Sequence, residues 1–231
     1  MRGLKPLQNL NDLSRGIYKH WVWGTEEKYR FTCNCLQKIS YSIQDLNMEI
    51  ETLEYPSMKL TMKELIFIIA LVDWIKEAVD SLFANLRTEV IKFLNLKSDS
   101  EYEKANKYFK AIRSFVLAHP LNTNRHKDIG LDGDLICVDI RREPSIHTMF
   151  YQNSLDWFIL DMNGLRSTTV GEPFDCILCV YSNRLDGGRF FKYVKVNFAD
   201  IYNVAKLNIE QLYLIDSKLK YLTKKKVGIK S

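Results

Sequence analysis

In the first half of the chain, apolar residues recur with the spacing of α-helices. Between Thr25 and Leu53 they follow a nearly seven-residue repeat, which predicts one long helix with a single buried seam. The members of this seam are Tyr29, Leu36, Ile39, Ile43, Leu46, Ile50 and Leu53. Tyr55 precedes Pro56 and is therefore pushed out of the helical backbone region, so we expect the helix to end there.

A second helix is predicted to begin at a capping box made by Thr61 and Glu64, whose side chains can satisfy free N–H groups of the first turn. The helical pattern continues to about Leu96. Residues Ile66–Val72 are apolar on nearly all sides. This part of the helix is therefore expected to be central and well covered by neighbours.

A third helix is predicted from a second capping box, Ser98 and Glu101, and is expected to end before Pro120. On a wheel of about 100° per residue, its apolar face contains Ala105, Tyr108, Phe109, Ile112, Phe115 and Val116. His119 follows Ile112 by seven residues and falls near the middle of this face. Arg113 lies at the edge of the face, while Lys110 lies on the polar side.

The second half of the chain changes to short apolar runs, which are typical of β-strands. Four such runs are separated by turn sequences: Asp134–Arg142, Ser154–Met162, Phe174–Ser182 and Gly188–Phe198. The turn Leu185–Gly188 predicts that the last two runs form an antiparallel hairpin. After Asp200 the helical spacing returns, and the chain closes with a basic tail.

This order of elements indicates an α+β, mainly α fold in a single domain. Residues 1–127 are predicted to form a helical bundle, residues 128–199 a small antiparallel β insertion, and residues 200–231 a returning C-terminal helix and basic tail. A separate C-terminal α+β domain would have the same order of elements, but no flexible boundary favours it.

Composition narrows the class of protein. The 231 residues are 46% hydrophobic and 26% charged, as in globular proteins, and the formal charge of +5 permits a nucleic-acid partner without requiring one. The five cysteines show no disulfide spacing, and Cys176 and Cys179 are predicted to point to opposite faces of a strand. We therefore expect buried free thiols.

No segment indicates a membrane, a metal or a cofactor. The most apolar run, Leu65–Ile75, has eleven residues and is too short to span a bilayer, and the N-terminus lacks an apolar signal core. We expect a cytoplasmic protein. His20 and His147 are isolated, and nucleotide-binding and serine-hydrolase motifs are absent from the sequence, so neither a metal site nor a cofactor is predicted.

Two interpretations of Arg113 and His119 are open. A histidine in the last turn can bind free carbonyls at the negative end of a helix, and an arginine at the border of an apolar stripe commonly pairs with a carboxylate. Alternatively, histidine can move a proton near neutral pH while arginine holds a phosphate through its planar fork. Together these two groups can cut RNA without a metal.

The segment Arg113-Ser-Phe-Val-Leu-Ala-His119 resembles the R-x(4–6)-H motif of the HEPN superfamily (higher eukaryote and prokaryote nucleotide-binding domains), which are helical bundles with this motif on a late helix. Many members are metal-independent endoribonucleases of toxin–antitoxin or phage-defence systems, and they commonly dimerise. The resemblance implies that Arg113 contacts phosphate, His119 acts as acid or base and Ser114 fills the adjacent polar position. It also implies that an acidic residue of the preceding helix steadies Arg113, and the candidates are Asp73, Glu77 and Asp80.

Other basic residues could extend an RNA-binding surface. Arg125, His126 and Lys127 follow the predicted helix, and Lys110 lies within it, although an ordinary polar loop explains the first three equally well. On the strands, basic residues alternate with aromatic residues that resemble a base-stacking platform. These are Arg141, Arg142, Lys192 and Lys195, with Phe190, Phe191 and Tyr193. Aromatics that enter the core are the simpler interpretation.

The sequence thus leaves two functions open. The first is a dimeric HEPN-like ribonuclease, or a protein derived from one, that acts on RNA and has an antitoxin or regulatory partner. The second is a non-catalytic dimeric helical module for interaction or regulation, in which Arg113 and His119 are structural.

Overall fold

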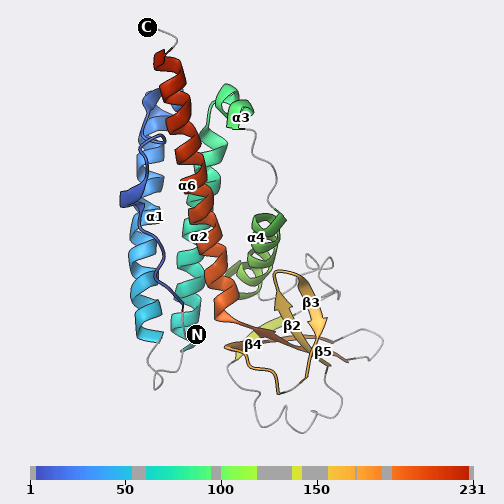
Figure 1. Ribbon diagram of the computed structural model, residues 1–231. Coiled ribbons are helices and arrows are strands. Elements are labelled where there is room, and N and C mark those ends of the chain that lie inside the picture. The colour runs from blue at the N-terminus through green and yellow to red at the C-terminus, as the bar shows by residue number, and fades with distance from the viewer. Residues whose placement is uncertain are drawn as a thin grey trace.

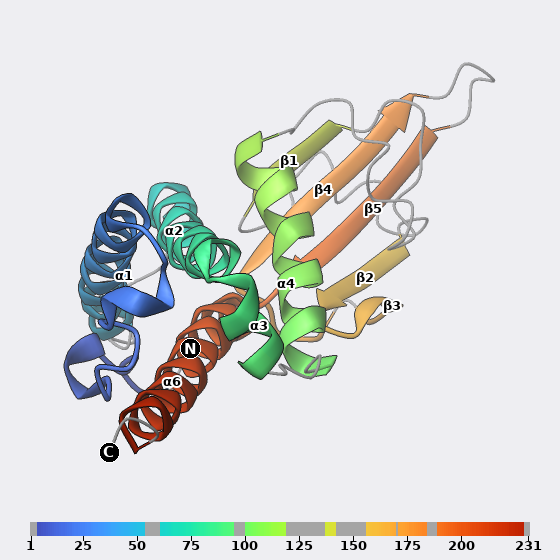
Figure 2. The ribbon, with the colours of Figure 1, turned by 90° about the horizontal axis from the view of Figure 1, so that it is seen from above.

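The computed structural model shows a bundle of helices attached to one five-stranded sheet (Figure 1). It describes residues 4–53, 61–94, 100–118, 137–141, 156–169, 171–183 and 189–228. Three long helices, α1, α2 and α6, run side by side, and α4 lies over one face of the sheet (Figures 1 and 2). The mainly helical α+β fold predicted from the sequence is confirmed.

Helix α1 (Glu26–Leu53) matches the predicted long helix. Glu26 and Glu27 lie in its first turn, where negative charge favours the N-terminus of a helix. The predicted seam is buried at Leu36, Ile39, Ile43, Leu46 and Ile50, and Tyr29 is partly buried. Pro56 lies outside the described residues.

Helix α2 (Met62–Asn85) begins at the predicted capping box, in which Glu64 N donates to Thr61 Oγ1 and Thr61 N donates to Glu64 Oε2. The prediction that this helix continues to about Leu96 is wrong. The backbone becomes extended at Leu86, and a separate helix, α3, covers Thr88–Leu94. The break follows a tertiary contact, because Arg87 N donates to the carbonyl of Val22 in the N-terminal segment.

The prediction that Ile66–Val72 is covered on nearly all sides is also wrong. Leu65, Ile68, Ile69, Leu71 and Val72 are buried, but Ile66 and Phe67 are 40% and 39% exposed. Since α1, α4 and α6 pack on the other sides of α2, one of its faces is left open to solvent.

Helix α4 (Ser100–Arg113) continues directly into a π-helical turn, η3 (Ser114–Ala118). The predicted apolar face is buried at Ala105, Tyr108, Phe109, Ile112 and Phe115, and Val116 is partly buried. Ser98 lies outside the described residues, so the second capping box is not tested.

The sheet contains β1 (Cys137–Arg141), β2 (Asp156–Asp161), β3 (Gly164–Ser167), β4 (Cys176–Asn183) and β5 (Arg189–Val196) in the order β1-β4-β5-β2-β3. The predicted antiparallel pairing of β4 with β5 is confirmed. The sheet is not antiparallel throughout, since β2 pairs with β5 in parallel. The sequence also missed β3, which forms a hairpin with β2 through a turn ending at Gly164, whose φ is 107°.

Alternate strand residues enter two different apolar clusters. Leu178 and Val194 join the main core beneath the helices, whereas Ile177 and Tyr193 form a second cluster on the other face of the sheet. Cys176 and Cys179 separate in the same way, as the sequence predicted. Bundle and sheet therefore share one continuous core.

Helix α6 (Phe198–Gly228) begins directly after β5 and returns along the bundle. Its buried Asp216 accepts hydrogen bonds from Ser14 N, Ser14 Oγ and Ile17 N, which fixes the N-terminal segment against the helix. Gly16 lies so close to α6 that no side chain fits there. Among the helices of the described ranges, none is both long and apolar enough to cross a bilayer.

Candidate functional site

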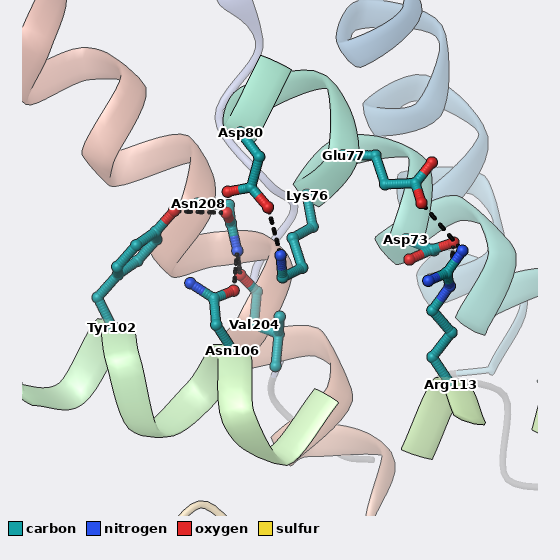
Figure 3. Close-up of polar contacts among 9 residues, drawn as sticks. All are labelled: Asp73, Lys76, Glu77, Asp80, Tyr102, Asn106, Arg113, Val204 and Asn208. Carbon is teal, nitrogen blue, oxygen red and sulfur yellow. Dashed lines mark hydrogen bonds and ion pairs between the residues drawn. The ribbon is translucent and has the colours of Figure 1, made fainter. Parts of the chain in front are cut away.

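Arg113 is the last residue of α4 and is held by two carboxylates of α2 (Figure 3). Its Nε lies 2.7 Å from Asp73 Oδ2, and its Nη2 donates to Glu77 Oε1 at 2.9 Å. Asp73 and Glu77 are four residues apart and so share one face of α2. The arginine side chain remains 41% exposed. The two carboxylates thus orient the guanidinium and leave part of it exposed to solvent.

The two acids differ in their surroundings. The side chain of Asp73 is 9% exposed and that of Glu77 is 55% exposed. Burial raises the pKa of Asp73; the Arg113 charge lowers it in part, and the Glu77 charge adds to the increase. Asp73 is therefore the inner anchor of the guanidinium, and Glu77 is the outer, solvated one.

Arg113 keeps hydrogen-bonding capacity on its outer side. A guanidinium carries five N–H donors in a fixed fork. Asp73 faces Nε and Glu77 faces one proton of Nη2, so within the described part of the chain the Nη1 group is not committed to either carboxylate. An oxyanion such as a phosphate can be held by that edge.

The π-helical turn η3 changes where the residues after Arg113 point. A π turn holds more residues per turn than an α turn, so positions beyond it rotate away from a 100° wheel. Ser114 and Phe115 are buried, whereas Leu117 is 40% exposed. The predicted position of His119 on the face of Ile112 assumed a regular α-helix after Arg113. The π turn contradicts this assumption. His119 itself lies outside the described residues.

The remaining predicted site residues are placed as follows. Lys110 is exposed on α4, one turn before Arg113. Asp80 does not join Arg113 and pairs with Lys76 instead, pointing away from the arginine (Figure 3). Arg125, His126 and Lys127 lie outside the described residues. Of the three acidic candidates, the structure brings Asp73 and Glu77 to Arg113.

A buried polar network on the other side of α2 was missed by the sequence analysis. Asn208 of α6 is fully buried; it accepts from Tyr102 Oη at 3.1 Å and donates to Asn106 Oδ1 at 3.2 Å and Val204 O at 2.8 Å. Burial, with a smaller effect of the Asp80 charge, raises the pKa of Tyr102 to about 12. These contacts fasten α4 to α6, and so they position the helix that carries Arg113.

Two of the strand residues, Lys195 and Tyr193, do not lie on the basic surface considered above. Lys195 is fully buried, and its Nζ donates to Thr169 O and Glu172 O at 2.6 and 2.8 Å. Burial lowers the pKa of Lys195. Tyr193 is also buried and stacks on Trp157 with ring centroids 4.8 Å apart. The interpretation that the aromatics enter the core is therefore confirmed at Tyr193. The side chains of Arg141, Phe190 and Phe191 and the whole of Arg142 lie outside what is described.

A groove between α1 and α2 was also missed. It has a volume of about 270 Å³ and is lined by Asn34, Cys35, Lys38, Trp74, Glu77, Ala78 and Ser81. The ammonium of Lys38 lies 3.3 Å from the centroid of the Trp74 ring, which is a cation–π contact. Glu77 belongs both to this groove and to the Arg113 site, so the two are neighbours.

Within the described residues, no three His, Cys, Asp or Glu side chains lie close enough together to hold a metal ion. No protein-family model, no curated protein and no solved structure matches the chain.

Proposed function

We propose that this chain is a HEPN-like, metal-independent endoribonuclease of the toxin–antitoxin or phage-defence type, or a protein derived from one. The observation that carries the proposal is the partly exposed position of Arg113. Its guanidinium is oriented by Asp73 at 2.7 Å and Glu77 at 2.9 Å, stays partly exposed, and precedes His119 by six residues. Carboxylate pairing also fits a structural arginine, so the partly exposed guanidinium and the histidine six residues later are what favour catalysis.

In the proposed reaction each group has one task. Arg113 binds the non-bridging oxygens of the scissile phosphate and stabilises the charge that develops there. His119 moves the proton of the attacking 2′-hydroxyl or of the leaving oxygen, because its ordinary pKa lies near neutrality. Ser114 fills the polar position beside the arginine. Lys110, Arg125, His126 and Lys127 provide further phosphate contacts, which depend on salt.

The proposed assembly is a cytoplasmic homodimer in which two copies of the motif face a shared groove, together with an antitoxin or regulatory partner. A two-fold axis places the same patch of each subunit in the interface. The described residues fit this arrangement in that α1 and α2 expose large apolar side chains: Phe31, Tyr41, Met48, Ile66 and Phe67.

The same exposed side chains favour a second candidate, a non-catalytic dimeric interaction or regulatory module. Large apolar side chains left open to solvent are available for contacts with another protein. In this alternative, Arg113 ties α4 to α2, and RNA is not cleaved.

RNA cleavage by the purified protein in the presence of a chelator separates the two candidates. We expect the wild type to cut single-stranded RNA, and Arg113→Ala and His119→Ala each to remove the activity while circular dichroism stays that of the wild type. Arg113→Ala should also lower the melting temperature, because it leaves the buried Asp73 without its partner. Asp80→Asn is the matched control, because Asp80 pairs with Lys76 and not with Arg113. If intact RNA is recovered from the wild type, or if His119→Ala mainly lowers the melting temperature, the interaction module is the correct function.

A further inference from the structure

Trp74 forms one wall of the α1–α2 groove and presents a flat aromatic surface at its mouth. The residue is 39% exposed, although it is among the largest apolar residues of α2. Its ring is covered by the exposed Lys38, whose ammonium lies 3.3 Å from the ring centroid. Because cation–π contacts at exposed sites are weak, another flat group can replace Lys38 on the ring.

The other walls of the groove, which include Cys35 and Ala78, combine apolar and polar groups, and most of the exposed lining is apolar. Asn34, Lys38, Glu77 and Ser81 line it together with Trp74, so amide, ammonium, carboxylate and hydroxyl groups surround one aromatic face. Ligand sites are predominantly apolar, with a few polar groups that fix the orientation of the ligand. One stacking surface with donors and acceptors around it matches a nucleobase, which has a π face and a polar edge.

The size of the groove also fits a single ring system. Its volume of about 270 Å³ lies just under the lower end of the range of sites for drug-sized ligands, roughly 300–1,000 Å³. A single base fits within this volume.

The groove lies next to Arg113 across a single turn of α2. Asp73 and Trp74 are consecutive, and Glu77, one turn later, both lines the groove and accepts from Arg113 at 2.9 Å. A strand whose base stacks on Trp74 therefore carries its phosphates past two cations, Lys38 on one side and Arg113 on the other.

We propose that the α1–α2 groove is a base-binding subsite for single-stranded RNA, in which an unpaired base stacks on Trp74 and Lys38 moves from the ring to an adjacent phosphate. This inference rests on the proposed function, since Arg113 then holds the neighbouring scissile phosphate. The subsite explains how a protein of mild net charge can hold a flexible strand, because stacking adds affinity that does not depend on charge.

The test measures binding and cleavage separately. A fluorescein-labelled 12-nucleotide RNA with 2′-O-methyl riboses cannot be cut by 2′-hydroxyl attack, so its Kd is read by anisotropy for the wild type and for Trp74→Ala, Trp74→Phe and Lys38→Ala. Tyr221→Ala is the matched control, because Tyr221 is an exposed aromatic of α6 (64% exposed) that does not line this groove. Unmodified RNA of the same sequence reports cleavage in chelator.

We expect Trp74→Ala to weaken binding about 10-fold to 100-fold, which is the range measured when one stacked base is lost. Trp74→Phe and Tyr221→Ala should stay within about threefold of the wild type, because phenylalanine keeps a π face. Lys38→Ala should reduce the salt dependence of Kd by about one ion. Equal melting temperatures of Trp74→Ala and Trp74→Phe show that the loss is not one of folding.

Three outcomes overturn the inference. If the wild type binds and cuts RNA but Trp74→Ala has the same Kd, the subsite is wrong and the proposed function stands. If the wild type neither binds nor cuts RNA, both are wrong. If Trp74→Ala leaves Kd unchanged but lowers the mass of the protein in sedimentation, the groove is a protein interface.

Discussion

Arg113 and Asp73 join the end of α4 to the middle of α2, with Nε lying 2.7 Å from Oδ2. The two residues are forty positions apart in the sequence, and the carboxylate is the more buried of the two side chains. Because a buried carboxylate facing a guanidinium restricts the rotamers of both, the contact sets where the outer edge of Arg113 points.

The first prediction follows from this contact. Asp73→Asn keeps the size of the side chain but removes the charge that orients Arg113, so we expect RNA cleavage to fall about 10-fold to 100-fold. Asp80→Asn makes the same change two turns later on α2, away from Arg113, and should leave the rate within about twofold of wild type. Initial rates with a labelled RNA in chelator measure both. Equal rates for Asp73→Asn and Asp80→Asn would show that Asp73 does not position the arginine.

The second prediction concerns Asp200, in the first turn of α6. Burial, together with the charges of Asp161 and Asp175, raises the pKa of Asp200 to about 6, while Arg166 acts in the opposite direction. The folded state therefore binds this proton more tightly than the unfolded chain, in which an aspartate titrates near roughly 3.9. The resulting stability is fully present below about pH 4 and is lost as the pH rises through about 6.

Asp200→Asn removes this titration. Relative to wild type, the variant should gain free energy of unfolding between about pH 4 and 6, and it should keep that gain at pH 7.5. Denaturant titrations at four pH values measure the difference, which is more reliable than the absolute values. A wild-type-minus-variant difference that is flat across this range would contradict the assignment.

The third prediction tests how closely the N-terminal segment packs against α6 at Gly16. A Cβ atom at Gly16 would lie 2.2 Å from Asp216 O and 2.4 Å from Lys220 N, and helix backbone cannot yield by that much. Gly16→Ala should therefore cost at least about 3 kcal/mol of unfolding free energy. At Gly171 a Cβ would meet no atom within 4 Å, so Gly171→Ala is the control and should be nearly neutral. Urea denaturation followed by circular dichroism measures both. A Gly16→Ala protein as stable as Gly171→Ala would show that the N-terminal segment does not pack closely on α6 at this position.

The fourth prediction concerns the Asn208 network. Asn208→Ala leaves Tyr102 Oη and Asn106 without their buried partner, so we expect it to destabilise the protein by about 1–3 kcal/mol. Tyr102→Phe removes the hydroxyl that donates to Asn208 Oδ1, and so it leaves that buried oxygen without this donor. In a double-mutant cycle the two losses should add to more than the loss in the double variant. Strictly additive losses would mean that the two residues do not interact.

Several features of the fold could be predicted because they depend on neighbours along the chain. The seam of α1, the capping box of Thr61 and Glu64, the buried face of α4 and the pairing of β4 with β5 all follow from local spacing or turn chemistry. The opposite placement of Cys176 and Cys179 follows from the alternation of side chains along a strand.

Other features depend on residues that meet only in the folded chain. No proline or glycine marks the end of the helix at Leu86. The helix ends where Arg87 N donates a hydrogen bond to Val22 O. The parallel pairing of β2 with β5 depends on the order of strands in the sheet, which their apolar pattern does not contain. The exposed face of α2 was predicted to be covered, because apolar residues alone do not reveal on which sides a helix has neighbours.

The sequence by itself determined the mainly helical α+β class, the chief helices and four strands, and the place of Arg113 on the rim of an apolar stripe, since these depend on periodicity within a few turns. Only the tertiary structure decided that Asp73 and Glu77, and not Asp80, meet Arg113, and that Lys38 of α1 meets Trp74 of α2. The reason is geometric. Acids on one helix are equivalent in the sequence until the crossing of α2 and α4 selects the pair that faces the arginine.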